Sequence, residues 1–107
     1  MSRKRVATLN DLARVGAVEC RVRMTPGIAA MSEEDKSAIR EAVERFDSFG
    51  EDNDPQGERG SGSFNHHGAT VVWKIDYYDR ELERGSEDPG DPAVTQRVLT
   101  LMLASEY

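Results

Sequence analysis

Two groups of residues in this sequence carry side chains that could do chemistry, and the first is an acidic loop. Asp54 is part of an Asn-Asp-Pro turn, and Asp52 and Glu58 lie on either side of that turn. The spacing of the first positions is that of a calcium loop, but such a loop needs a bidentate Glu at its twelfth position, where this chain has Ser63. Two readings stay open: a looser metal site on the three carboxylates, or a tight turn built from Asp, Pro and Gly.

The second group contains a histidine pair and two aspartates. Adjacent residues on a strand point to opposite faces, so we expect that His66 and His67 do not chelate one metal ion. One histidine with Asp76 or Asp79 could act as a general base and the residue that orients it. Exposed turn histidines are the alternative. Asp76 and Asp79 could share acid–base work or a metal ion, or could end a strand.

Further acidic residues follow Asp79 and predict a negatively charged rim. These residues are Glu81, Glu83, Glu87, Asp88 and Asp91. The net charge of the chain is −6, divided into +2 for residues 1–43 and −8 for residues 44–107. Negative charge spread in this way favours contact with a basic protein surface and repels nucleic acid. The alternative is that it only keeps a small protein soluble.

Other reactive residue types lack the neighbours that catalysis needs. Cys20 is the only cysteine, and it lies on the apolar side of a predicted strand without a basic neighbour, which is typical of a buried thiol. Gly57, Gly60 and Gly62 precede no helix, so they do not form a phosphate-binding loop. We therefore predict no catalytic residue and no cofactor.

The strands that must position these groups are indicated by alternation. Residues 71–79 place Val71, Trp73, Ile75 and Tyr77 on one face, which predicts a central strand. Residues 18–24 alternate in the same way. Phe64 opens a further strand, and His67-Gly68 is predicted to be the hairpin turn that leads into the Trp73 strand.

Three helices complete the prediction. They cover residues 3–15, the segment from the N-cap Ser32 to Phe49, and a segment that starts at Asp91-Pro92. In the last helix, the predicted buried residues are Val94, Val98, Leu101 and Met102. This order of elements predicts one α+β domain over residues 1–107, with a small antiparallel sheet of about three strands and helices packed on one face.

Length and composition are consistent with one such domain. The chain has 107 residues, of which 37% are hydrophobic and 32% are charged, so it can build a single core. The longest apolar run, Leu101–Ala104, is too short to span a membrane. No apolar signal-peptide core follows the basic start at residues 3–5. We predict a cytoplasmic protein, and a single cysteine agrees because it excludes an intrachain disulfide.

Three motifs resemble a family of short bacterial proteins of unknown function, mostly proteobacterial and often encoded on mobile elements. The motifs are Asp52–Pro55, Trp73–Asp79 and Arg97–Tyr107, and the similarity runs over about residues 5–107. The resemblance implies no activity and no catalytic residue. Family members often have Glu-His-Asp where this chain has Glu58, Arg59 and Gly60. If that triplet binds metal or does chemistry elsewhere, this chain has lost it.

The first functional hypothesis is a small, acidic, non-catalytic binding protein. The mobile-element setting implied by the resemblance suggests an inhibitor of host defence, of the anti-CRISPR or anti-restriction type. It would occlude a basic nucleic-acid-binding surface on a protein partner without binding nucleic acid itself. The predicted contact residues are Asp52, Asp54, Glu58, Asp76, Tyr78, Asp79, Glu81 and Glu83. Among them, Asp52, Asp54, Tyr78 and Asp79 should dominate the affinity.

Two further hypotheses come from other classes. One is a metal-binding domain or metal-dependent hydrolase with the ligands Asp52, Asp54, Glu58, His66 and Asp76. The other is a module that dimerises through a sheet edge or its last helix, because Leu99, Leu101, Met102 and Leu103 cover more than one helix face. The sequence leaves open a monomer or a homodimer, and whether the acidic segments form one patch.

Overall fold

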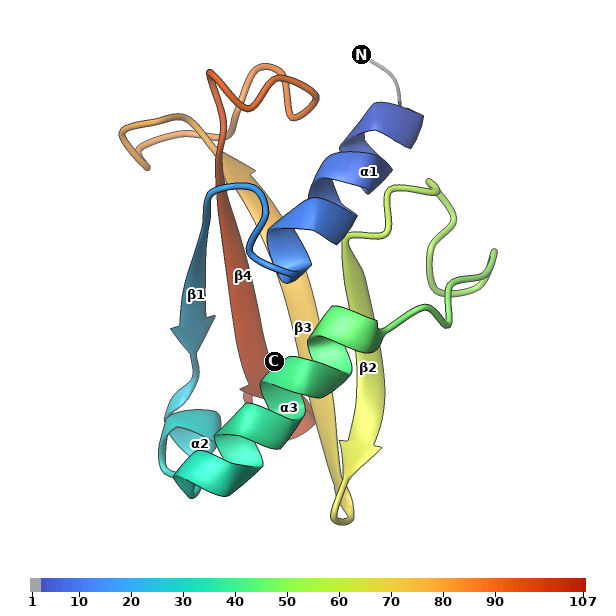
Figure 1. Cartoon of the computed structure of the whole chain (residues 1–107), viewed down its shortest axis with the longest axis vertical. Coiled ribbons are helices and arrows are strands. Elements are labelled where there is room, and N and C mark those ends of the chain that lie inside the picture. Colours follow the sequence, from blue (N-terminus) through green and yellow to red (C-terminus); the bar gives the residue numbers. More distant parts are fainter. Residues whose placement is uncertain (1–2) are drawn as a thin grey trace.

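A computed structural model describes residues 3–107 and contains a mixed sheet with helices on one face (Figure 1). The strands are β1 (Cys20–Met24), β2 (Ser61–His66), β3 (Ala69–Tyr78) and β4 (Gln96–Leu103), in the order β1-β4-β3-β2. β3 pairs antiparallel with β2 and β4, whereas β1 runs parallel to β4. The helices are α1 (Arg3–Arg14), α2 (Pro26–Ala29) and α3 (Glu33–Arg45), and the 3-10 turn η1 (Ala104–Glu106) follows β4. The predicted α+β class is confirmed, with four strands instead of about three and one parallel pairing.

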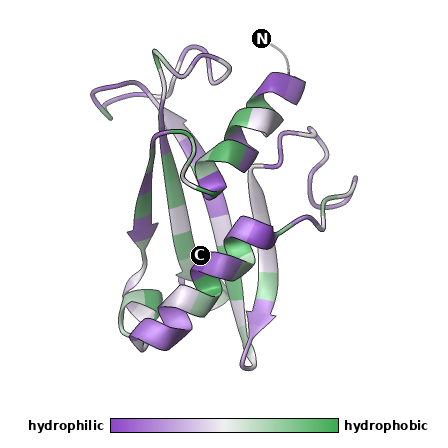
Figure 2. Ribbon diagram, viewed as in Figure 1, coloured by the Kyte–Doolittle hydropathy of each residue, from purple (hydrophilic) through white to green (hydrophobic). Residues whose placement is uncertain are grey.

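The core lies between β3, β4 and α3. Val71, Trp73 and Ile75 are buried, so the predicted alternation along β3 is confirmed. Apolar side chains of α3, Ile39 and Val43, are buried in the same cluster. Figure 2 shows apolar residues on the sheet and on the side of the helices that faces it. Burial of this apolar surface is the main stabilising contribution to the fold.

α3 begins where the sequence predicts and ends four residues earlier. The Ser32 hydroxyl accepts a hydrogen bond from the Asp35 backbone N–H at 3.0 Å, which makes Ser32 the N-cap. At Phe46 the backbone becomes extended, with φ −61° and ψ 128°. The rings of Phe46 and Phe49 then pack edge-on against Trp73, at centroid distances of 5.5 and 6.1 Å. The two phenylalanines thus belong to the core although they lie beyond the helix.

The predicted C-terminal helix is wrong, because residues 96–103 form the central strand β4. β4 is buried on both faces, and a mostly apolar segment of this kind does not distinguish a strand from a buried helix. The Asp91-Pro92 signal is a real turn. The Asp91 side chain accepts a hydrogen bond from the Ala93 N–H at 2.9 Å, and the Val94 N–H bonds to the Asp91 carbonyl at 3.3 Å. The chain then enters β4 instead of continuing as a helix.

The predicted hairpin turn is confirmed. His67 and Gly68 connect β2 to β3, and both have positive φ angles, 49° and 87°. Two positive φ angles are typical of the tight type I′ turn, which follows the twist of the flanking strands. Within residues 3–107, no helix is long and apolar enough to cross a membrane.

Candidate functional site

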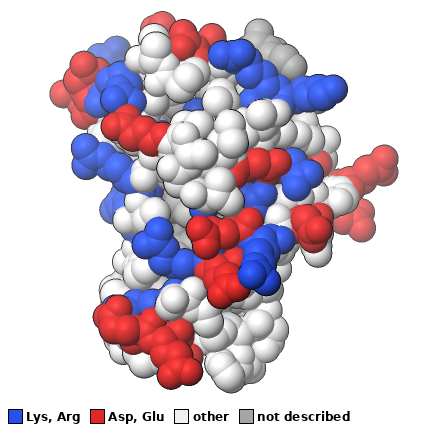
Figure 3. All heavy atoms as spheres, viewed as in Figure 1, with Lys and Arg blue, Asp and Glu red and all other residues white. Residues whose placement is uncertain are grey.

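Two acidic loops lie at the end of the sheet opposite the hairpin turn. Residues 46–60 connect α3 to β2, and residues 79–95 connect β3 to β4. The first loop has five acidic residues and one basic residue, the second has six and two, and each therefore has a net charge of −4. The loops lie on either side of α1 (Figure 1). The acidic segments thus form two surfaces, and Figure 3 shows basic side chains interspersed among the acidic ones.

Three of the predicted contact carboxylates hold the local structure together. Both oxygens of Asp54 accept the Arg59 backbone N–H at 3.1 Å, and Asp79 Oδ1 accepts the Glu83 N–H at 3.0 Å. Asp76 Oδ2 lies 3.3 Å from the Lys74 ammonium. Replacement of these residues would therefore alter the turns or the strand as well as any contact.

Three other predicted contact residues are free for a partner. Asp52, Glu81 and Glu83 are exposed. Their carboxylates make no hydrogen bond or ion pair with any residue in the described range 3–107. Glu58 is half-buried, and its backbone carbonyl accepts a hydrogen bond from Asn10.

Tyr78, the remaining predicted contact residue, lines a groove of about 630 Å³. The alternation along β3 places Tyr78 on the sheet face opposite the buried Trp73, so the groove lies on the face away from the helices. Leu82 and Val98 form its apolar part with Tyr78, and Arg21 and Arg23 of the edge strand β1 form the other wall. The groove therefore has an apolar floor and two arginines in its lining, and Glu81 and Glu83 flank the lining residue Leu82 in the chain.

Leu82 has an unusual backbone conformation on a well-ordered turn. Its N–H donates to the Asp79 carbonyl at 3.0 Å, and the Asp79 N–H donates to the Arg84 carbonyl at 2.8 Å. The φ angle of Leu82 is 60°, a left-handed conformation that costs a residue with a side chain about 1–2 kcal/mol. This leucine is also 37% exposed. Strained backbone that presents an exposed apolar side chain points to a function in binding.

A buried polar network fixes both acidic loops to the sheet. Asn10 of α1 is fully buried, and its amide donates to the Tyr77 hydroxyl at 2.7 Å and to the Glu58 carbonyl at 3.0 Å. Its side-chain oxygen accepts from Arg97 Nε at 2.8 Å. Arg97 Nη2 donates in turn to the Pro89 carbonyl. One asparagine and one arginine thus connect the loop at Glu58 with the loop at Pro89.

Arg97 is a buried cation that has no carboxylate partner among residues 3–107. Its guanidinium lies 5.1 Å from the centre of the Tyr77 ring, and its Nη1 has no hydrogen-bond partner among residues 3–107. Burial lowers the pKa of Arg97 and raises the pKa of the Tyr77 hydroxyl. Contact with the aromatic face compensates for part of the lost hydration of the cation. The network is therefore a structural support for the loops.

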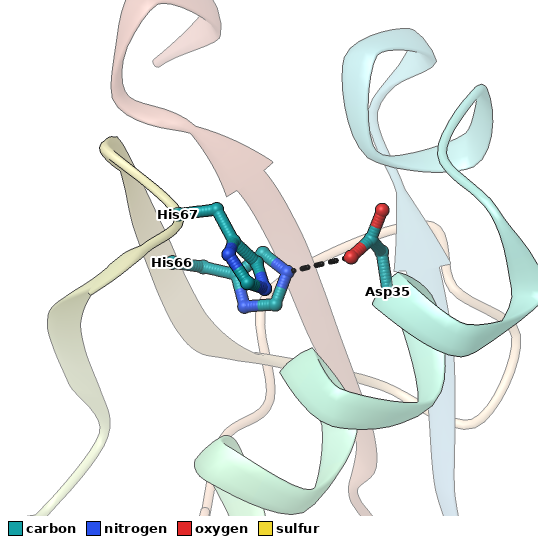
Figure 4. Close-up of side chains that lie close together, drawn as sticks. All are labelled: Asp35, His66 and His67. Atoms are coloured by element: carbon teal, nitrogen blue, oxygen red, sulfur yellow. Dashed lines mark hydrogen bonds and ion pairs between the residues drawn. The ribbon is translucent and has the colours of Figure 1, made fainter.

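A histidine cluster lies at the hairpin end of the sheet (Figure 4). His66 Nε2 is 3.1 Å from Asp35 Oδ1, and the two imidazole rings are in edge contact at a centroid distance of 4.4 Å. Side-chain atoms of Asp35, His66 and His67 that could bind a metal lie within 4.8 Å of one another. The prediction that the histidine pair diverges is therefore wrong. His67 lies in the turn with a positive φ angle, so strand alternation does not apply to it.

The predicted metal ligands do not come together. In the described range 3–107, the only group of three His, Cys, Asp or Glu residues close enough to hold an ion is the Asp35 cluster. Asp52, Asp54 and Glu58 lie in the loop before β2, whereas His66 lies at the far end of that strand. Cys20 was predicted to be buried and is half-buried against the core, where burial raises the pKa of its thiol.

Comparison with known proteins gives one match. A family described as "Protein of unknown function (DUF3768)" matches residues 24–106. The chain belongs to this family. Neither the curated proteins nor the solved structures contain a match. The matched range includes β2 to β4, both acidic loops and the histidine cluster, so each of these features lies in the family region of the chain.

Glu58, Arg59 and Gly60 of this DUF3768 member lie against α1. Arg59 Nε donates to Asp11 Oδ1 at 3.0 Å, and its guanidinium lies 4.4 Å from the centre of the Phe49 ring. A Cβ atom at Gly60 would lie 3.3 Å from the Tyr77 hydroxyl. In this family member, these positions therefore join the first acidic loop to α1.

Some of these residues had no functional role in the sequence prediction. Asn10 falls at helical spacing from Val6 and Ala13, on the buried side of α1, so a polar residue on an apolar stripe was the available signal. The sequence contained no such signal for Arg97, because its segment was predicted to be a helix. Asp35, in the first turn of α3, was not among the predicted ligands.

Proposed function

We propose that this protein is a non-catalytic protein-binding module, and that its main contact is the Leu82 surface. We define this surface as Tyr78, Leu82 and Val98 with the carboxylates of Glu81 and Glu83. The observation that carries the proposal is Leu82, an exposed apolar side chain held in a left-handed backbone conformation beside the groove.

The chemistry of the Leu82 surface supports a folded protein as the partner. Protein interfaces combine an apolar, partly aromatic centre with a polar rim. Tyr78 and Leu82 would supply the centre, and the exposed Glu81 and Glu83 would supply an acidic rim. Arg21 and Arg23 line the same groove, so basic and acidic side chains both surround the apolar centre. This mixture of charges disfavours a simple polycation as the partner.

The acidic rim favours a partner with a basic surface. Carboxylates without an internal partner are available for lysine and arginine, and such complementary charges increase the association rate and the specificity. The class of partner that we propose is a nucleic-acid-handling protein, such as a CRISPR or restriction complex, whose basic substrate site would be occluded. Asp52, on the other acidic loop, would make a second and separate contact.

Capture from host lysate with nuclease added, followed by mass spectrometry, tests this proposal when it is done with matched variants. The test variant is Glu81→Lys with Glu83→Lys. Both residues are exposed and have free carboxylates, so the fold should be retained. The control is Glu41→Lys with Glu44→Lys, which reverses two exposed charges on α3.

The expected result is one basic, nucleic-acid-handling partner that wild type and control retain and the Glu81/Glu83 variant loses. Recovery of the same partner by all three proteins would contradict the proposed surface. Asp54 and Asp79 are avoided as test positions because their carboxylates hold backbone turns.

A further inference from the structure

Asp35, His66 and His67 present the donor atoms of a transition-metal site at the hairpin end of the sheet. We propose that these three side chains bind one divalent late transition-metal ion, with Zn²⁺ as the expected occupant. The site lies at the other end of the sheet from the Leu82 surface, so it is independent of the proposed function.

The fold brings the three residues together from two elements. The alternation along β2 places His66 on the side of the sheet that α3 covers, where its side chain is 14% exposed. Asp35 belongs to the first turn of α3 and points toward His66 (Figure 4). The positive φ angle of His67 turns its ring back against that of His66.

The distances are compatible with an ion after small side-chain rotations. Bonds of about 2.0–2.1 Å to nitrogen and oxygen place the ligands of a tetrahedral ion about 3.3 Å apart. His66 Nε2 and Asp35 Oδ1 are 3.1 Å apart, close to this value. All three donor atoms lie within 4.8 Å of one another. His67 is exposed, so its ring can rotate without disturbing the core.

A hydrogen bond outside the cluster orients the carboxylate. The Ser32 hydroxyl lies 3.0 Å from Asp35 Oδ2, which leaves Oδ1 directed at His66. Support of this kind fixes ligand geometry in metal sites.

The donor set selects the class of metal. Two imidazoles and one carboxylate suit Zn²⁺ and its neighbours, whereas Mg²⁺ and Ca²⁺ prefer oxygen ligands alone. Three protein ligands leave one tetrahedral position for water or for a group of another molecule. A bound ion would also join the hairpin tip to the start of α3.

The test uses tag-free protein, stripped with a chelator and then titrated with Zn²⁺ by calorimetry and thermal melting. We expect one ion per chain. When Zn²⁺ reaches about 100 times Kd, the Tm should rise by about 10 °C, because the ion binds only the folded state. Mg²⁺ at the same concentration should give no shift.

Two variants assign the ligands, and a third variant is the control. His67→Asn removes a ligand but keeps the turn, because asparagine tolerates a positive φ angle. Asp35→Asn removes the carboxylate charge. Each should weaken Zn²⁺ binding at least tenfold, whereas the exposed neighbour Glu34→Gln should bind like wild type. Melting without metal checks that each variant is folded.

Two results would overturn the proposal. One is the absence of stoichiometric Zn²⁺ binding by folded wild-type protein, which would leave His66 and Asp35 as an ordinary hydrogen-bonded pair. The other is unchanged binding by both His67→Asn and Asp35→Asn, which would place the ion elsewhere on the chain.

Discussion

At the scale of single residues, a few buried polar side chains hold the acidic loops in place. Asn10 and Arg97 connect α1 and β4 to the backbone of both loops through three hydrogen bonds and an aromatic contact. Buried polar groups stabilise a fold only when their partners are present, because an unpaired group loses its hydration without compensation. The exposed carboxylates are therefore presented on loops of fixed position.

Asn10→Ala should destabilise the protein by about 3 kcal/mol, because it leaves Arg97 Nε, the Tyr77 hydroxyl and the Glu58 carbonyl without a partner. Urea denaturation measures the change in the free energy of unfolding. Thr8→Ala is the matched control on the same helix, since its exposed hydroxyl bonds only to the Lys4 carbonyl. A loss for Asn10→Ala no larger than that of Thr8→Ala would contradict the role of the network.

The substitution Leu82→Gly distinguishes a role of Leu82 in partner binding from a role in the stability of the fold. Glycine adopts a positive φ angle without strain, which offsets its greater freedom in the unfolded chain, so the Tm should stay constant or rise by a few degrees. Binding of the partner should weaken at least tenfold, since the exposed apolar side chain is lost. The exposed Val94→Gly in the same loop is the control. A variant with reduced Tm and intact binding would refute the assignment of Leu82.

At the scale of elements, the sequence predicted caps and turns more accurately than the type of element that follows them. The Ser32 cap and the His67-Gly68 turn are both present, because each depends on a few neighbouring residues. β4 was misread because its apolar residues lack a period once both faces are buried. Dimerisation through a last helix is excluded, since Leu99, Leu101 and Met102 are core residues of the strand, whereas dimerisation through a sheet edge stays a prediction.

The candidate sites show the same limit. Tyr78, Glu81 and Glu83 could be named from their types and positions in the chain. The proximity of Asp35 to His66 depends on how α3 crosses the sheet, and the position of the His67 ring depends on a turn conformation. Asp54 and Asp79 resembled contact residues because sequence does not distinguish a free carboxylate from one that holds a turn.

Glu106 connects η1 to α2 and predicts a pH dependence. Its carboxylate accepts the Thr25 hydroxyl at 2.6 Å and the Gly27 N–H at 2.8 Å. These hydrogen bonds, that of Thr25 first, lower the pKa of Glu106. A lowered folded-state pKa gives stability that is present above the unfolded value of about 4.3 and is lost as the pH falls through the folded value.

Thermal melts of wild type and Glu106→Gln across pH measure this contribution. The Tm of the variant should be lower than that of wild type at pH near 7, and the two should converge below pH of about 4 as the wild-type carboxyl is protonated. Glu83→Gln, an exposed carboxylate without an internal partner, serves as the control. A Tm difference that does not change with pH would show that the carboxylate charge is not the cause.

At the scale of the whole molecule, the sheet separates two surfaces of different chemistry. The loop end carries the two acidic loops and the Leu82 surface, and the hairpin end carries the histidine cluster and the acidic first turn of α3 (Figure 1). The acidic loops together have a net charge of −8, more than the −6 of the chain, so the remainder is net basic. Contact with a partner through the loop end would therefore leave the other end accessible.

Occlusion is tested most directly by competition for the captured partner between labelled nucleic acid and this protein. We expect that wild-type protein displaces the nucleic acid and that the variant Glu81→Lys with Glu83→Lys does not. Direct binding of this protein to the partner, measured without nucleic acid, should also weaken as the salt concentration rises, because the contact is partly electrostatic. A stable complex that contains the partner, the nucleic acid and this protein together would contradict occlusion of the nucleic-acid-binding surface.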